Sequence, residues 1–130
     1  MAAFSDYLEN KVLGHVFGGT SYTAPTTLYV ALYTVAPSDT GGGTEVSGGG
    51  YARQTSTFNV SGTNPTEATN ASAIEYPEAT ANYGTVVAVG VFDALTSGNL
   101  LAYSTLTPSK TIDSGDVFRI NAGNLDITLA

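Results

Sequence analysis

Short apolar runs, whose side chains alternate between two faces, dominate this sequence from residue 28 onward. The clearest run, residues 28–33, reads Leu-Tyr-Val-Ala-Leu-Tyr. A period of two residues is that of a β-strand, because successive side chains of a strand point to opposite faces. Both alternating sets are apolar or aromatic here, so either face of this strand can be buried. This pattern predicts that the chain folds as a β protein.

Other segments of the chain repeat this composition of β-branched, aromatic and alternating residues. The further predicted strands are residues 51–60, 73–76, 85–92, 100–106, 117–120 and 125–129. The last of them sets Leu125, Ile127 and Leu129 against polar neighbours, which predicts one inward face. Gly, Asn, Asp and Ser, the residues of tight turns, separate several of the segments. We therefore predict an all-β fold, a jelly-roll-like or meander β-sandwich with one short N-terminal helix.

The predicted helix covers residues 4–17, within an N-terminal helical segment of residues 1–18. Ser5 is a suitable N-cap, and Asp6 and Glu9 lie in the first turn, where carboxylates interact favourably with the helix dipole. An apolar stripe with four-residue spacing consists of Phe4, Leu8, Val12 and Val16. The glycines at 18 and 19 end the helix.

The length of the chain limits its domain organisation. With 130 residues and a mass of 13.3 kDa, it can bury one core. We expect residues 1–130 to form a single β-sandwich domain. Two Gly triplets make residues 38–50 a Gly-rich flexible loop, because ordering glycine costs much backbone entropy. A second polar stretch, residues 61–72, is expected to connect strands.

The charge of the chain is low and acidic. Four Lys and Arg stand against eleven Asp and Glu, which gives a net charge of −7 and a pI near 4.2. Such a surface repels phosphate backbones, so we expect no nucleic-acid partner. No apolar run approaches the roughly 20 residues that span a bilayer, and acids stand where a signal peptide carries Lys or Arg. We expect no membrane partner, and synthesis in a cytoplasm before the chain joins a larger assembly.

Few residues offer catalytic chemistry. The absence of Cys excludes a thiol nucleophile, a disulfide and a Cys-based zinc site. The single histidine, His15, is expected to be solvated or to lie near the helix C-terminus. Asp93, Asp113 and Asp116 could serve a glycosidase, but they lie in turn sequences, where carboxylates commonly bind backbone N–H groups. We predict no catalytic residue and no cofactor, and a small carbohydrate-active enzyme is the less favoured alternative.

Metal and nucleotide sites have equally little support. The segment 113–116, Asp-Ser-Gly-Asp, could ligate Ca²⁺ with the help of carbonyl oxygens, but it lacks the length and the terminal Glu of an EF-hand loop. We predict a turn there and no metal site, although sequence leaves calcium binding open. The Gly-rich loop contains no lysine, which excludes a Walker loop.

Tyr51 and Arg53 leave the Gly-rich loop together on one face of a predicted strand. Tyr and Arg are favoured anchors of protein interfaces, and the chain has only two arginines. A surface cation lying over an aromatic ring explains the pair equally well. Both interpretations stay open at the level of the sequence.

Five segments, in order along most of the chain, form a recognisable set. They read FSDYLENK at 4–11, LYVALYT at 28–34, TEVSGGGYARQ at 44–54, VFDA at 91–94 and GNLL at 98–101. The set resembles a family of small virion proteins of tailed bacteriophages, and the run from Glu45 to Arg53 is its most distinctive part. Members of that family are often labelled tail-fibre-like proteins. Relatives in icosahedral heads are cement, or decoration, proteins on the outside of the major capsid protein shell.

The resemblance implies a phage capsid cement protein that binds the outside of the shell and stabilises the head. The alternative is a tail or tail-fibre-associated structural protein. The implied partners are the major capsid protein and further copies of the chain, with a trimer favoured over a dimer because head lattices offer many threefold positions. The implied location is the outer capsid surface of the virion, or else its tail. The residues expected to make these contacts are Phe4, Tyr7, Leu8, Glu45, Tyr51 and Arg53.

Overall fold

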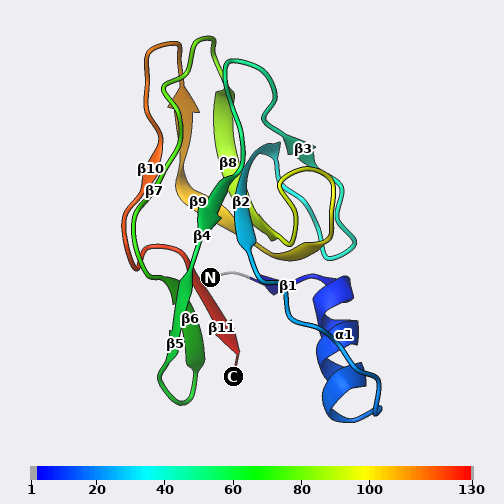
Figure 1. Ribbon diagram of the computed structural model, residues 1–130. Coiled ribbons are helices and arrows are strands. Elements are labelled where there is room, and N and C mark those ends of the chain that lie inside the picture. Colours follow the sequence, from blue (N-terminus) through cyan, green and yellow to red (C-terminus); the bar gives the residue numbers. More distant parts are fainter. Residues whose placement is uncertain (1–2, 130) are drawn as a thin grey trace.

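The computed structural model describes residues 3–129, which form antiparallel strands and one helix (Figure 1). The helix is α1 (Asp6–Val16). The strands are β1 (Ala3–Phe4), β2 (Leu28–Val35), β3 (Thr44–Glu45), β4 (Gln54–Ser56), β5 (Phe58–Ser61), β6 (Thr66–Asn70), β7 (Ile74–Glu75), β8 (Gly84–Phe92), β9 (Leu100–Ile112), β10 (Arg119–Ile120) and β11 (Asp126–Leu129). The predicted all-β fold with one short N-terminal helix is confirmed. Those parts of the domain and helix predictions that fall on residues 1, 2 and 130 lie outside the described residues.

The strands form one large and two small sheets. The large sheet has the order β1-β9-β8-β2-β3, and β4 also pairs with β2. The small sheets are β10-β7 and β11-β6-β5, and every strand pair is antiparallel. The pairs β8–β9 and β5–β6 are meander-like, since their strands are consecutive in sequence. The neighbours β2 and β8 are instead joined by a long connection that carries β3 to β7.

The main core lies between the large sheet and the two small sheets. Val30 and Leu32 of β2 belong to this core, whereas Ala31 and Tyr33 belong to a smaller cluster that includes Phe92. The segments opposite β2 contribute Ile74, Tyr76, Phe118, Ile120 and Leu125 to the main core. The four consecutive β2 residues from Val30 to Tyr33 are all buried. Both faces of this part of the strand are therefore covered, as its double alternation predicted.

The predicted strand over residues 51–60 is two strands in two sheets. β4 pairs with β2 in the large sheet, while β5 pairs with β6 in the three-stranded sheet. The chain therefore changes sheets at Thr57. Residues 51–53 are not part of a strand. The sequence carries no sign of this break, because Thr is itself common in strands.

Polar and Gly-rich segments hold two strands that their composition did not indicate. β6 lies within the predicted polar connection 61–72, where β5 and β11 on either side satisfy its backbone hydrogen-bonding groups. β3 lies within the predicted loop 38–50 and pairs with the end of β2. β9 is longer than the predicted 100–106, because β8 continues to pair with it across a register shift.

α1 begins as the sequence predicted and then extends away from the sheets (Figure 1). The Ser5 hydroxyl accepts a hydrogen bond from the Leu8 N–H at 3.2 Å and donates to the Leu100 carbonyl oxygen at 2.5 Å, which ties the N-cap to β9. Phe4 lies in β1 rather than in the helix, so the predicted apolar stripe is divided between a strand and a helix. No residue of α1 is buried.

Gly90 in β8 occupies a position where a side chain does not fit. A Cβ atom added there would lie 2.9 Å from both Leu100 Cδ1 and Tyr33 Cε1. We expect Gly90→Ala to lower the free energy of unfolding by about 1–3 kcal/mol through overpacking. The matched control is Gly14→Ala in α1, whose added Cβ would have no neighbour closer than 4.0 Å. Because Ala favours helices, this control should raise stability by up to about 1 kcal/mol. Denaturant unfolding of both variants measures the difference, and equal shifts would contradict the packing described.

Candidate functional site

An apolar groove with a volume of about 290 Å³ opens between the α1 and β1 side of the molecule and the three-stranded sheet. Phe4 and Leu8 line it from the first side, and Ala68 and Ile127 line it from the second. Of the lining side chains, which all lie within residues 3–129, only Glu67 is ionisable. Apolar surfaces of this kind commonly mark protein contacts. The groove is therefore the candidate functional site, and its chemistry is that of binding.

The alternation of the three-stranded sheet produces its side of the groove. The strand register places Val60 and Ile127 on either side of Ala68 in one cross-strand row. Leu129 pairs with Thr66 in the next row. Directly paired residues share a face of the sheet, so these rows present a mostly apolar face to the groove. Val60 and Leu129 lie at its edge, where they are 72% and 58% exposed.

The groove is continuous with the main core. Leu125, which precedes β11, is buried in that core, Ile127 packs partly against it, and Leu129 is largely exposed. The predicted alternation of these three residues is thus present, but only Leu125 is fully inward. The end of β11 thus extends past the part of the molecule that covers its apolar face. Sequence reasoning found the apolar face of β11 and missed its neighbour Ala68, because residues 61–72 lack an apolar pattern.

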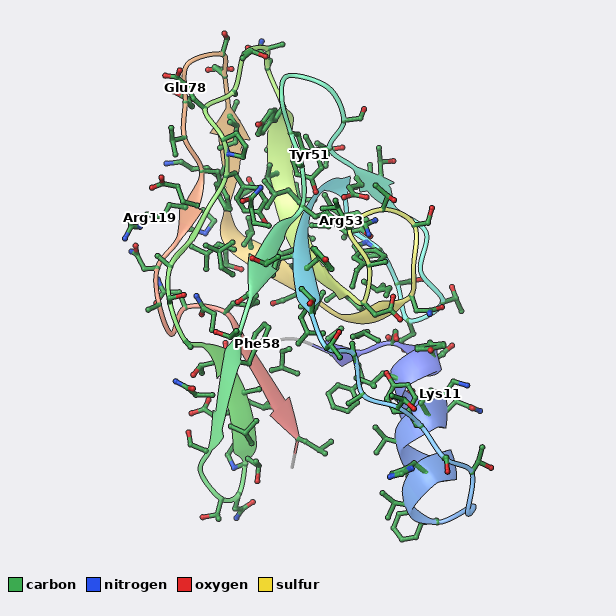
Figure 2. All side chains as sticks on the ribbon, in the orientation of Figure 1. Lys11, Tyr51, Arg53, Phe58, Glu78 and Arg119 are labelled. Carbon is green, nitrogen blue, oxygen red and sulfur yellow. The ribbon has the colours of Figure 1, made fainter. Side chains whose placement is uncertain are left out.

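The structure brings together Glu45, Tyr51 and Arg53, none of which lines the groove. Figure 2 labels Tyr51 and Arg53. Arg53 binds the Glu45 carboxylate with two nitrogens, Nη2 to Oε1 at 2.8 Å and Nε to Oε2 at 2.9 Å. The Tyr51 hydroxyl donates to Glu45 Oε2 at 2.7 Å and accepts from the Leu32 N–H at 3.0 Å. Arg53 is only 8% exposed. The three residues form a polar cluster within the chain, in which Arg53 is buried and Glu45 and Tyr51 are half-buried.

Arg53 also fixes the loop between β8 and β9. Its Nη1 donates to the carbonyl oxygens of Ala94 at 2.9 Å and Ser97 at 2.8 Å. Its guanidinium carbon lies 3.8 Å from the centroid of the Phe92 ring. The cation therefore lies over Phe92 rather than Tyr51, and in the interior rather than at the surface. Interface contacts of Glu45, Tyr51 and Arg53 stay a prediction.

The polar cluster shifts the pKa values of its members. Burial alone would raise the pKa of the Glu45 carboxyl, but hydrogen bonds from Arg53 and Tyr51, together with the charge of Arg53, outweigh it and hold this pKa below its usual range. Burial and the hydrogen bond to Glu45 raise the pKa of Tyr51 far above its usual range. Burial also raises the pKa of Tyr33, which belongs to the smaller apolar cluster, to about 12. At neutral pH the cluster therefore pairs one carboxylate with one guanidinium beside neutral phenols.

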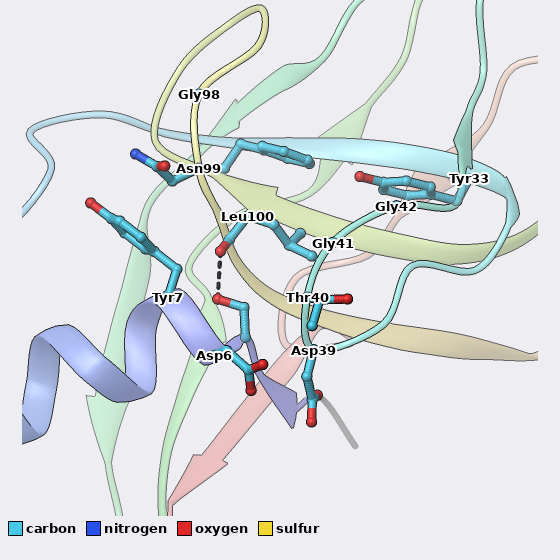
Figure 3. Close-up of a pocket in the computed structure, with 12 residues that line it drawn as sticks. Asp6, Tyr7, Tyr33, Asp39, Thr40, Gly41, Gly42, Gly98, Asn99 and Leu100 are labelled. Atoms are coloured by element: carbon cyan, nitrogen blue, oxygen red, sulfur yellow. Dashed lines mark hydrogen bonds between the residues drawn. The ribbon is translucent and has the colours of Figure 1, made fainter.

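Tyr7 lines a second, more polar cavity of about 420 Å³ at the start of α1 (Figure 3). Across this cavity lie the loop residues Asp39 and Asn99. The Asp6 N–H donates to the Asp39 carbonyl oxygen at 2.9 Å, and the Tyr103 hydroxyl donates to the Asp39 carboxylate. The cavity thus lies where the start of α1 meets the segment 38–50. Of the three predicted contact residues near the N-terminus, Phe4 and Leu8 line the groove, whereas Tyr7 lines this cavity.

Two of the three acids considered for catalysis, Asp93 and Asp116, bind backbone N–H groups of turns through their carboxylates. The Asp93 carboxylate accepts hydrogen bonds from the backbone N–H and the side-chain amide of Asn99, at 2.8 and 2.9 Å. Asp116 Oδ2 accepts from the Asp113 N–H at 2.9 Å. The turn role predicted for Asp93 and Asp116 is therefore confirmed.

His15 lies exposed in the last turn of α1, as predicted, and its Nδ1 accepts a hydrogen bond from the Tyr22 N–H at 3.1 Å. Within residues 3–129, no three His, Asp or Glu side chains lie close enough together to hold a metal ion. In the same range, no helix has the length and apolar character needed to cross a membrane.

A family model described as "Podophage GP4 fiber I protein gp80" matches residues 3–128. The chain belongs to this family. Its members are phage virion structural proteins, so the resemblance read from the sequence is confirmed at that level, and the virion is the place of this chain. The family description names a structural role and no catalytic activity. Among curated proteins, none matches the chain.

The ion pair between the buried Arg53 and the half-buried Glu45 predicts a large loss of stability in one variant. Glu45→Ala removes the partner of a buried guanidinium, and we expect it to lower the free energy of unfolding by about 3 kcal/mol. The matched control is Glu75→Ala, because the Glu75–Arg119 pair is exposed and its atoms are 3.4 Å apart. We expect that control to cost less than about 1 kcal/mol. Denaturant unfolding compares the two, and similar losses would contradict a stabilising role of the Glu45–Arg53 pair.

The lowered pKa of Glu45 predicts a pH dependence. A carboxyl whose pKa is lower in the folded than in the unfolded state stabilises the fold above its unfolded pKa, and this contribution disappears as the pH falls through the folded pKa. The stability difference between the wild type and Glu45→Gln should be constant above about pH 5 and shrink below about pH 4. Thermal unfolding from neutral to acid pH tests this, and a difference that persists in acid would contradict it.

Proposed function

We propose that this protein is a fibre-type structural component of a tailed-phage virion. The observation that carries the proposal is the match over residues 3–128 to a family described as a fiber I protein. The surface of the molecule supports a role in assembly. The apolar groove and a helix with no buried residue are surfaces that a neighbouring protein would cover.

In this function the chain acts through shape and contact rather than through a reaction. The sheets and the polar cluster provide a rigid body, since Arg53 joins β3, the 51–53 segment and the loop after β8. The groove and α1 provide the attachment surfaces. Many such contacts, repeated by the symmetry of a virion, add up to stable binding even if each is weak.

A cement protein on the outside of the major capsid protein shell is the second candidate. The form of the chain favours it, because residues 3–129 form one large and two small sheets and contain no repeated element that could build a long shaft. A small body with a lateral groove suits a repeated position on a lattice. The net charge of −7 would also keep such a protein from binding DNA during packaging. Its partner would then be the major capsid protein.

The number of copies per particle separates the two candidates. We would measure it in purified virions by gel densitometry against the major capsid protein band, together with immunogold labelling of intact particles. A fibre component should be present in far fewer copies than the shell protein, with label confined to fibres. A cement protein should approach the copy number of the shell protein, with label over the whole head. Absence of the chain from purified particles would contradict both.

A further inference from the structure

We propose that copies of this chain bind one another head to tail, with the exposed apolar end of α1 in one copy inserted into the apolar groove of the next. This helix end consists of Leu13, Val16 and the C-cap residue Phe17. The groove is the one lined by Phe4, Leu8 and the three-stranded sheet. The contact is between copies of the chain, so it goes beyond the proposed function and holds for either position in the virion.

The chain exposes more surface than a compact monomer of its size. Its accessible surface is 7116 Å². A folded monomer of 13.3 kDa is expected to expose about 6,450 Å². The excess of about 650 Å² approaches the roughly 800 Å² that each partner buries in a standard protein interface. Figure 1 shows where the outline departs from a compact body, at the two projections formed by α1 and by the three-stranded sheet.

α1 lacks the contacts that normally stabilise a helix of its length. It has 11 residues, none of them buried, whereas isolated helices shorter than about 12–15 residues are marginal in water. Its end carries the most exposed large apolar side chain of the described residues, Phe17 at 81%, and Leu13 and Val16 are also largely exposed. A partner that covers this end would supply the missing packing.

The charge distribution favours a second copy as that partner. Two chains of net charge −7 repel each other over most of their surfaces. Residues 12–22 at the helix end contain no Asp or Glu, although Asp6 and Glu9 lie on the same surface as Leu13 and Phe17, and Glu67 is the one acidic residue that lines the groove. The contact therefore brings together few of the acids of this chain, and apolar burial can offset their repulsion.

Leu13 and Phe17 face away from the groove, so the contact can repeat, whereas Val16 continues the apolar stripe of Leu8. Nine residues separate Leu8 from Phe17, which is about two and a half helical turns, so their side chains leave α1 on opposite sides. Leu8 lines the groove, whereas Phe17 and Leu13 lie on a separate surface beside Glu9. A contact between two different surfaces builds either a closed ring or an open filament. The trimer that the family resemblance implies is the smallest ring of this type.

Single substitutions on each surface test the contact. Phe17→Asp alters the helix end and Val60→Asp alters the groove edge, and both positions are exposed enough to leave the fold intact, which circular dichroism would verify. The control is Val117→Asp, which is 50% exposed and lies on neither surface. In sedimentation velocity, the wild type and the control should form the same oligomer. Each test variant should weaken association at least about tenfold, because it places an unpaired charge in an apolar contact.

Mixing the two variants distinguishes this contact from other modes of association. Phe17→Asp retains an intact groove and Val60→Asp retains an intact helix end, so the mixture should form a dimer that cannot grow further. A wild type that stays monomeric at all concentrations would overturn the proposal. Association that neither variant weakens, or variants that fail to complement each other, would also overturn it. Association that Val60→Asp weakens and Phe17→Asp does not would overturn it as well, and would indicate a symmetric groove-to-groove contact.

A cross-linking experiment tests the same contact without introducing charge. Since the chain has no cysteine, Phe17→Cys and Val60→Cys each supply the only thiol in their copy. Under mild oxidation, a mixture of the two should give mainly the mixed disulfide dimer. Equal amounts of mixed and identical pairs would overturn the proposal. The control pair, Val117→Cys mixed with Val60→Cys, should give little cross-linking.

Discussion

The guanidinium of Arg53 binds groups as many as 44 positions away in the chain. It pairs with Glu45 on β3, binds two carbonyl oxygens of the loop after β8 and lies over Phe92, which belongs to the smaller apolar cluster. A buried cation needs all of its donors satisfied, so its position constrains each of these segments. Glu45, Tyr51 and Arg53 all belong to the run on which the family resemblance most depends, and within this chain they bind one another. That run positions loops, whatever else it contacts in the virion.

The sequence predicted those elements that are determined by residues within the same segment, such as a helix cap or an alternating strand. Ser5 caps α1 as expected, and the double alternation of residues 28–33 corresponds to a strand buried on both faces. The break at Thr57 and the strand β6 depend instead on partners distant in sequence, because polar backbone becomes a strand only when neighbouring strands satisfy its hydrogen bonds. For the candidate site, the apolar stripe identified Phe4 and Leu8. The opposite wall was not predictable without knowing that β5, β6 and β11 assemble into one sheet.

The two ends of the molecule have different characters. Toward the polar cluster, side chains are buried in pairs and networks, and the loops are fixed to the sheets by specific hydrogen bonds. Toward the groove, the apolar face of the three-stranded sheet continues past the core and has no cover within the described chain. A rigid end and an incompletely covered end suit a subunit that holds its own shape and completes its packing through neighbours.

The absence of buried residues in α1 has a consequence for the lifetime of the protein before assembly. A helix that only its N-cap and first turn tie to the body opens with a small free energy, so its amides exchange with solvent and its backbone is open to proteases. A neighbour that binds only the folded helix shifts the opening equilibrium toward the closed form, and so protects the helix from exchange and cleavage. If a neighbour covers the helix in the virion, we expect proteases to cleave free copies faster than incorporated ones.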